Sequence, residues 1–316
     1  MNKKVVIFGG GTGLSYLLRG LKKFPIDITA VISVSDDGGS TGRLRKEFNT
    51  IAVGDIRKVI VALSEIDQPI RDMMSYRFNT SSDLDGHAVG NLILTSMMDI
   101  TGSIKNSIEA LSKLLDVKQK VLPISEDYDL TLVAKMENGK VVEGEAEITK
   151  SESKIKKIYY KKEPKVLPEV IDAIDEADLV IFSMGSLYTS VLPNIICSPV
   201  KKALKRSTAP IMYTCNIVTQ PGETDSFKVG DHISLINKYL EKRKVDVVVA
   251  NSEIIPKYLA EKYSTAEQKD PVLIDRNKLE DMEVELLEDN LLLVEKNILR
   301  HNSLKLSSII FSYLMR

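Results

Sequence analysis

The sequence predicts an α/β fold built on a doubly wound, mainly parallel sheet, and three consecutive segments near the N-terminus carry this prediction. Residues 5–8 form a short apolar run that ends in glycines, as buried central strands do. In residues 14–23, apolar side chains recur at helical spacing. Residues 28–34 form a second apolar run. Strand, glycine turn, helix and strand make a βαβ unit, which implies parallel strands.

The next part of the chain predicts helices rather than strands. A second small-residue loop, DDGGSTGR at residues 36–43, follows the second strand at once, and the chain from residue 44 has a helical pattern. We expect further helices at about 54–64, after the pair Gly86-His87, and at about 103–115. The small-residue loops therefore stand at the starts of helices.

The middle of the chain predicts a β-rich insertion at about residues 120–162. Residues 120–124 and 130–136 have strand character, and Asn138-Gly139 is a strong hairpin signal. Residues 140–148 alternate as the returning strand would. No repeat, low-complexity segment or linker divides the chain, so we expect a single domain over residues 1–316.

The β/α rhythm resumes after the insertion. We expect a helix at 168–176 and strands at 179–183, 211–215 and 245–250, with helices between them. The apolar stretch at 304–314 is either a helix that belongs to the core or one that forms a homodimer contact; the prediction favours the core.

Composition excludes several classes of protein. The chain of 316 residues carries 43 basic and 44 acidic residues, and this balance argues against a nucleic-acid partner. The two cysteines, Cys197 and Cys215, are too few for a disulfide scaffold and are expected to be buried. No signal peptide and no apolar run of about 18 residues is present, so we expect a cytoplasmic protein without membrane insertion.

The loop Gly9-Gly10-Gly11-Thr12-Gly13 is the clearest candidate for a binding site. Glycines allow the backbone to approach a phosphate closely, and the helix that follows presents free N–H groups. The spacing matches neither the dinucleotide fingerprint nor the Walker A loop. We therefore predict a phosphate-bearing ligand, with a nucleotide favoured, while a tight turn without ligand is the alternative.

Polar residues at the other strand ends extend this candidate site. Asp36 and Asp37 either bind Mg²⁺ or a sugar hydroxyl, or are turn-forming aspartates. Gly38 and Ser40 belong to the same loop. Asp36 also falls where a ribose-binding acid would lie in a nicotinamide enzyme, which keeps a dehydrogenase open as an alternative.

Another set of candidates lies at helix starts and in the second loop. His87 and Asn91, four residues apart, share one helix face and have either a site role or a structural one. Arg43, Asp55 and Arg57 supply either a phosphate clamp or surface ion pairs.

Taken in order, the segments GGGTGLSYLLRGLK, SVSDDGGSTGRLR, GDIRK, GHAVGN, MGSLYTSVLPN and CNIVTQPGETD resemble the bacterial gluconeogenesis factor family. That family is related to 2-phospho-L-lactate transferase. The resemblance spans nearly the whole chain and implies a Rossmann-like fold, a cytoplasmic protein, a role in cell shape and cell-wall homeostasis during gluconeogenic growth, and binding of UDP-sugars such as UDP-N-acetylglucosamine.

The resemblance also implies a set of site residues. They are Gly10, Gly11, Thr12, Gly13, Asp36, Asp37, His87, Asn91, Ser186, Asn216, Tyr263 and Arg300. From the polar loops at the strand ends we add Gly38, Ser40 and Gln220 as candidate binding residues. Met184-Gly185-Ser186 stands where Gly-Pro-Gly-Ser is more usual, and His301-Asn302 where His-Asp is commoner.

Three functions remain open. The first is a nucleotide-sugar-binding regulatory protein without a resident cofactor. The second is an Mg²⁺-dependent transferase of a phosphorus-containing group, with Asp36, Asp37 and His87 as candidate catalytic residues. The third and weakest is a nicotinamide-dependent dehydrogenase.

Overall fold

A seven-stranded parallel sheet forms the centre of the molecule in the computed structural model, which describes residues 2–316. The strand order is β10-β9-β8-β7-β1-β2-β3, and every neighbouring pair is parallel. The strands are β1 (Lys3–Gly9), β2 (Ile26–Ile32), β3 (Lys120–Pro123), β7 (Leu179–Phe182), β8 (Ile211–Thr214), β9 (Val247–Asn251) and β10 (Glu285–Asp289). In chain order this arrangement extends the Rossmann order 3-2-1-4-5-6 by one strand. The predicted fold class is confirmed.

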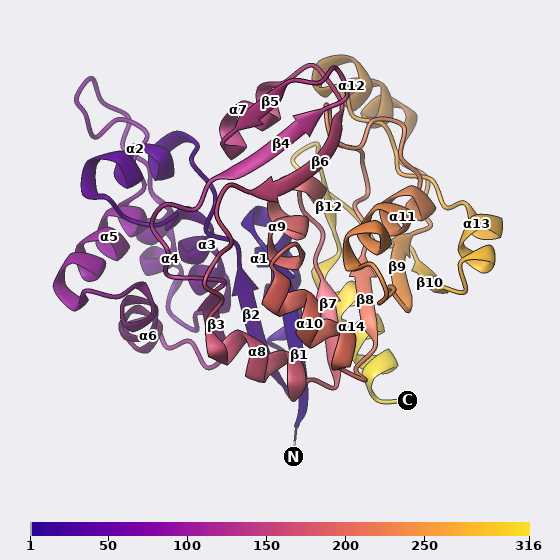
Figure 1. Cartoon of the computed structure of the whole chain (residues 1–316), viewed down its shortest axis with the longest axis horizontal. Helices are drawn as coiled ribbons and strands as arrows, with labels where there is room; N and C mark the ends of the chain where they lie inside the picture. The colour runs from indigo at the N-terminus through magenta and orange to yellow at the C-terminus, as the bar shows by residue number, and fades with distance from the viewer. Residues whose placement is uncertain (1) are drawn as a thin grey trace.

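Helices cover both faces of the sheet (Figure 1). In front lie α8 (Pro168–Asp175), α10 (Ser198–Arg206) and α11 (Val229–Leu240). On the other face α1 (Gly11–Leu21) packs against α3 (Gly54–Leu63) and the C-terminal α14 (Ser303–Leu314). The apolar strands between these layers are almost fully buried. The α14 helix buries Leu306 and Ile310, so the prediction that this stretch belongs to the core is confirmed.

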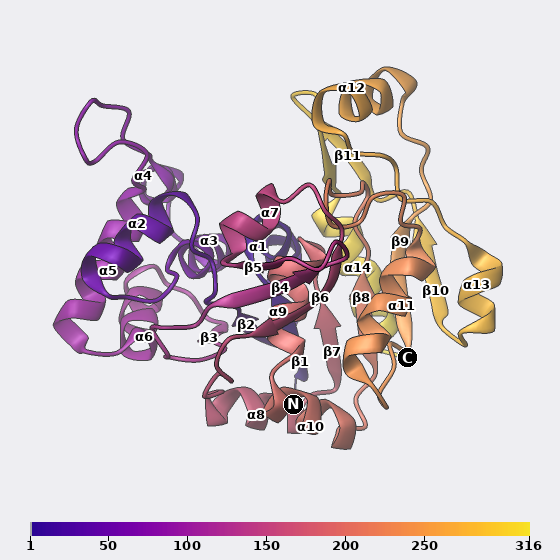
Figure 2. The same cartoon turned by 45° about the horizontal axis from the view of Figure 1, so that its top comes forward.

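Helices also fill the connection between β2 and β3, at the left of Figure 2. They are α2 (Gly39–Phe48), α3, α4 (Gln68–Ser75), α5 (Val89–Thr101) and α6 (Ile104–Leu114). The predicted helices at 54–64 and 103–115 are confirmed, whereas α4 was not predicted because it is short and mostly exposed. Farther along the chain lie η1 (Leu187–Val191), α9 (Leu192–Ile195), α12 (Lys257–Glu267), α13 (Arg276–Asp281) and the hairpin of β11 (Leu292–Glu295) and β12 (Ile298–His301).

A small antiparallel sheet crosses above the carboxyl ends of the central strands (Figures 1 and 2). It contains β5 (Val141–Glu143), β4 (Leu132–Met136) and β6 (Ile155–Tyr160), in that spatial order. The predicted hairpin at Asn138-Gly139 is confirmed, because β4 and β5 pair in antiparallel fashion.

Two details of the predicted insertion are wrong. The strand at residue 120 is β3, which pairs with β2 at the edge of the central sheet, so the insertion begins after it. The returning strand ends at Glu143, and residues Glu145–Lys150 form the helix α7. Gly144, at φ 91°, turns the chain, and the carboxylate of Asp37 accepts a hydrogen bond from the Ala146 N–H at 2.8 Å. The hydrogen bond from Ala146 to Asp37, a residue distant in sequence, thus favours a helix where the alternation of apolar and polar residues predicts a strand.

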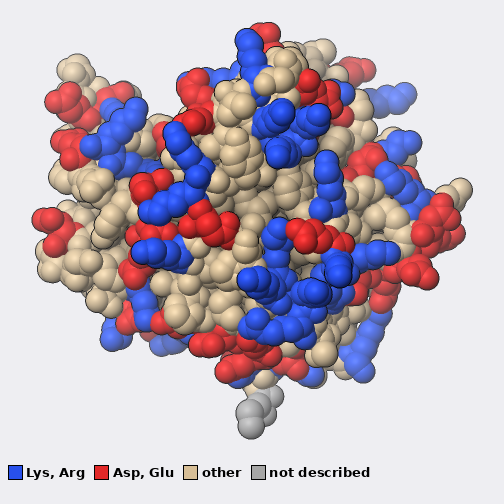
Figure 3. Space-filling model, viewed as in Figure 1, with Lys and Arg blue, Asp and Glu red and all other residues tan. Residues whose placement is uncertain are grey.

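Charge is mixed over the surface seen in Figure 3. Lysine and arginine side chains gather in front, over α10, and acidic side chains border them. Lys201 pairs with Glu241, and Arg206 pairs with Asp175. No helix among residues 2–316 has the length and apolarity needed to cross a membrane.

Candidate functional site

A crevice of about 650 Å³ lies at the carboxyl end of β1 and β7, where the strand order reverses direction. In doubly wound sheets this switch point is where ligands bind. We call it the glycine-loop crevice; it is lined by Gly10 to Gly13, Met184 to Ser186, Asn216 to Pro221 and Leu299 to His301, together with Thr149, Ser190 and Lys269. Of the predicted site residues it gathers the glycine loop, Ser186, Asn216, Gln220 and Arg300.

The glycine loop forms one wall of the crevice and opens α1. Gly11 has φ 63°, a conformation that disfavours other residues. A Cβ on Gly13 would overlap the carbonyl oxygen of Met184, so this glycine permits close contact between α1 and the loop after β7. No side chain among residues 2–316 caps the start of α1. The first N–H groups of the helix are thus available to an anionic group of a ligand.

The loop after β7 forms the opposite wall, and two side chains hold it. The Asn216 amide accepts a hydrogen bond from the Gly185 N–H at 3.0 Å and donates to the Gly185 carbonyl at 2.8 Å. The Ser186 hydroxyl donates to the carboxylate of Glu223 at 2.6 Å. The Glu223 carboxylate also accepts from the Tyr188 N–H and the Gln220 amide. Asn216 and Gln220 therefore shape the crevice as well as line it.

Glu223 is a buried ionisable group beside the crevice. It is only 7% exposed, and no cation pairs with it among residues 2–316. Burial raises the pKa of its carboxyl to about 7, against the opposing effect of the hydrogen bonds from Ser186 and Tyr188. The group is thus poised to change protonation near neutral pH. Sequence reasoning missed it, because an acid in a polar loop gives no signal of its later burial.

Arg300 and Tyr263 have different roles. Arg300, on β12, lines the crevice, and its guanidinium carbon lies 5.3 Å from the centre of the Tyr16 ring. Tyr263 is buried and does not line the crevice; its hydroxyl accepts a hydrogen bond from the Leu299 N–H at 2.9 Å. Tyr263 therefore positions the strand that carries Arg300. Next to Arg300 in the chain, the ring of His301 donates a hydrogen bond from Nε2 to the Cys215 carbonyl, and burial lowers the pKa of His301 to about 4.

The remaining predicted residues divide between a second cavity and the insertion. A cavity of about 380 Å³, here called the arginine cavity, takes its polar lining from Asp36, Ser40, Arg43, Lys58, Arg77 and Asn91, with Gly38 in the backbone. His87 is buried behind it, where its Nδ1 and the Ser40 hydroxyl share a hydrogen bond of 3.0 Å. Asp37 lines neither cavity, because its carboxylate receives the start of α7.

Asp55 lines neither cavity but lies beside residues of both. A Cβ on Gly10 would lie 2.6 Å from the Asp55 carboxylate, which pairs with Lys58 at 2.9 Å. Burial, and then the nearby charge of Asp55, raise the pKa of Asp36, although a hydrogen bond from the Gly38 N–H opposes this shift. The carboxylate that accompanies Asp36 between the cavities is thus Asp55 rather than the predicted partner Asp37.

The carboxylates fit a metal only in a limited way. Among residues 2–316 no group of three or more His, Cys, Asp or Glu side chains has a ligating arrangement. Mg²⁺ commonly takes one or two protein carboxylates and completes its shell with water and phosphate oxygens. Asp36 and Asp55 are candidates for such ligands, with Lys58 already paired with Asp55, and one carboxylate oxygen of Asp37 is engaged by α7.

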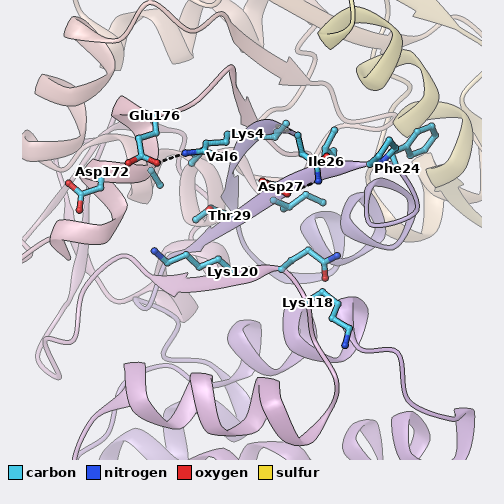
Figure 4. A pocket seen from close by; sticks show the side chains of 16 residues that line it. Lys4, Val6, Phe24, Ile26, Asp27, Thr29, Lys118, Lys120, Asp172 and Glu176 are labelled. Carbon is cyan, nitrogen blue, oxygen red and sulfur yellow. Dashed lines mark hydrogen bonds and ion pairs between the residues drawn. The ribbon is translucent and has the colours of Figure 1, made fainter.

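A third cavity, of about 610 Å³, lies at the opposite edge of the sheet (Figure 4). There the Lys4 ammonium pairs with Glu176 at 2.7 Å, and the Asn2 amide donates to Asp27 at 3.0 Å. These two pairs thus engage part of the polar lining of this cavity. Its place at the amino ends of β1 and β2 sets it apart from the switch point.

Strand order, the glycine turn into α1 and the crevice at the switch point define the chain as a Rossmann-like α/β protein. It belongs to the 2-phospho-L-lactate transferase CofD family, whose sequence profile matches residues 5–292. The resemblance found in the sequence motifs is thereby confirmed.

Relatives named as gluconeogenesis factors match the chain along nearly its whole length. The protein of Bacillus subtilis (strain 168) is 42% identical over 312 residues, which cover 98% of each chain. That of Halalkalibacterium halodurans is 44% identical over 309 residues, covering 98% of this chain and 95% of its own. A crystal structure of a Bacillus halodurans protein superposes with a TM-score of 0.95 at 43% identity, covering 98% of this chain and 100% of the other.

Proposed function

We propose that the protein binds a nucleotide sugar of the UDP-N-acetylglucosamine type in the glycine-loop crevice and acts as a cytoplasmic regulatory factor for cell shape and cell-wall homeostasis during gluconeogenic growth. The observation that carries this proposal is the uncapped start of α1, which lines the crevice together with Arg300. Helix N–H groups and a guanidinium are the groups that recognise a diphosphate. The gluconeogenesis factors that match the chain support the regulatory part of the proposal.

The volume of the crevice and its chemistry suit such a ligand. About 650 Å³ falls within the range of small-molecule sites. Backbone and side-chain groups of Thr219, Gln220 and Asn216 offer both donors and acceptors to a base or a sugar. Ile217 and Leu299 supply apolar surface beside them.

A Mg²⁺-dependent transferase is the second candidate function. Its support is the family of the chain and the position of Asp36 and Asp55 between two cavities. A bound Mg²⁺ would neutralise phosphate charge, while Asp36 and Asp55 would hold it and Lys58 would keep the Asp55 carboxylate in place. The nicotinamide alternative is weaker, because Asp36 lines a cavity other than that of the glycine loop.

A thermal-unfolding panel separates these functions. The wild-type protein is mixed with UDP-N-acetylglucosamine, UDP-glucose, GDP or NAD, each with and without Mg²⁺, and mass spectrometry then checks whether the ligand is intact. At 100 times its Kd, a ligand adds about 2.7 kcal/mol of stability. Stabilisation by an intact UDP-sugar supports the regulatory protein. Stabilisation by GDP with Mg²⁺ alone supports the transferase and contradicts the main proposal.

Arg300→Ala tests the site itself. We expect it to weaken nucleotide-sugar binding at least about tenfold, because a charge-assisted hydrogen bond to phosphate is lost. Arg19→Ala is the matched control: its guanidinium also lies 5.3 Å from the Tyr16 ring, but Arg19 does not line the crevice. Equal affinities of the two variants in calorimetry would contradict the placement of the ligand.

A further inference from the structure

The arginine cavity has the features of an anion site of its own. Arg43 donates to the Asp85 carbonyl, and Arg77 donates to the Gly86 carbonyl at 2.7 Å, so one short segment holds both guanidinium groups beside the cavity. Each guanidinium carries five N–H donors, most of which these contacts leave free for a ligand. Lys58 also lines the cavity, where it pairs with Asp55, and Asp36 is the carboxylate among the lining residues.

The start of α2 adds backbone donors to these cations. The helix begins at Gly39, and no side chain among residues 2–316 caps it. Gly39, Ser40 and Thr41 of its first turn all line the arginine cavity. Their N–H groups have no partner within the helix, and the helix dipole favours an anion at this end.

Asn91 supplies an independent sign of a missing partner. Its side chain is 1% exposed and lines the cavity, and its Nδ2 donates to the Ser40 hydroxyl at 3.2 Å. Its Oδ1 is buried and has no hydrogen-bond partner among the described residues. Either orientation of the amide leaves one polar atom without a partner. A buried polar atom without a partner is unfavourable, so a ligand that enters the cavity and reaches this atom would be stabilised there.

A buried arginine behind the cavity strengthens the positive field. Arg57 is 4% exposed, donates to the Met74 carbonyl at 3.2 Å and forms no ion pair within residues 2–316. It packs against Gly90, the residue before Asn91: a Cβ on Gly90 would lie 2.7 Å from the Arg57 Cδ. A buried cation without a carboxylate is unfavourable unless an anion compensates it.

We propose that the arginine cavity binds a small hydroxylated anion, a phosphate ester or a hydroxy acid, as a second ligand separate from the nucleotide sugar. The anionic group meets Arg43, Arg77 and the start of α2, while a ligand hydroxyl donates to Asn91 or Asp36. Asp55 lies between this cavity and the glycine loop, so the two ligands would bind on either side of it, next to each other.

Calorimetry with three probes tests this site: inorganic phosphate, glycerol 3-phosphate and glycerate, at low ionic strength. We expect at least one of glycerol 3-phosphate and glycerate to bind more tightly than inorganic phosphate. The one that binds more tightly identifies the anionic group of the ligand. Arg43→Gln combined with Arg77→Gln is expected to weaken that binding at least about tenfold. The control Arg206→Gln removes a surface cation of α10 and is expected to leave the affinity unchanged.

Asn91→Asp provides a second variant, because it keeps the shape of the side chain and adds a repelling charge. It too is expected to lose at least about tenfold in affinity. Saturating UDP-N-acetylglucosamine is expected not to displace the probe. The proposal is overturned if no probe binds the wild type at about 10 mM, if the variants bind as well as the wild type, or if the nucleotide sugar competes. Probe binding without any nucleotide-sugar binding would refute the proposed function and leave this site standing.

Discussion

Glu223 shows how one residue links the burial of a loop to the pH dependence of stability. Its pKa rises from an ordinary 4.5 to about 7 in the folded protein, so the folded state holds a proton that the unfolded state releases. The buried, protonated carboxyl therefore makes its full contribution to stability below pH 4.5. This contribution is lost as the pH rises through 7, where the carboxyl ionises in the folded protein. Ser186 and Gln220, which donate to this carboxylate, line the crevice.

Glu223→Gln is expected to remove this dependence. The amide carries no charge at any pH, so the stability of the variant relative to wild type rises between pH 5 and pH 8, by up to about 3 kcal/mol for a fully buried group. Urea unfolding at both pH values measures the difference. Glu253→Gln, a change at an exposed position, serves as the control. The same pH profile for wild type and Glu223→Gln would contradict the assigned pKa.

The sequence and the structure give different reasons for a glycine at position 13. The motif predicted a glycine for phosphate approach, whereas the structure shows that a Cβ here would meet the Met184 carbonyl. Gly13→Ala is thus expected to lower the stability of the unliganded protein by about 1–3 kcal/mol, since overlap forces the backbone to shift. Thr12→Ala, at the neighbouring exposed position, should leave stability nearly unchanged in the same thermal scan.

At the scale of elements, helix α7 and the insertion depend on a contact that sequence patterns do not reveal. The alternation of residues 140–148 predicted a strand, yet Gly144 turns the chain and Asp37 receives the Ala146 N–H. Thr149 of the same helix reaches the glycine-loop crevice. Asp37 therefore influences the shape of the crevice indirectly, because it holds the start of the helix that carries Thr149.

Asp37→Ala is expected to loosen α7 and to speed hydrogen exchange of the amides from 144 to 150, with a loss of about 1 kcal/mol in global stability. The effect should be the same with and without Mg²⁺, because the carboxylate holds a backbone N–H rather than a metal. An effect that appears only in the presence of Mg²⁺ would instead make Asp37 a metal ligand. Exchange mass spectrometry on both samples decides between them.

On the scale of the whole molecule, the sequence predicted the central sheet well and the site only in part. The apolar runs identified β1, β2, β7, β8 and β9, because buried parallel strands have a strong local pattern. The exposed helix α4 and the strand β10, with its acidic residues, lack such a pattern.

Whether neighbouring strand-end loops share a cavity depends on packing that no local pattern encodes. The residues of the DDGGS loop and of α5 were expected beside the glycine loop, but most of that loop and Asn91 of α5 line a separate cavity together with residues of α2 and α3. Residues such as Asp55 and Glu223 gain their position only from contacts distant in sequence.

A crystal structure of the protein soaked with UDP-N-acetylglucosamine tests the central claim most directly. The account predicts density for the diphosphate at the N–H groups of Gly11 to Gly13, with the Arg300 guanidinium turned toward it and the nucleoside or sugar along residues 216–221. Density for the ligand in the arginine cavity, or an empty glycine-loop crevice at a saturating ligand concentration, would contradict it.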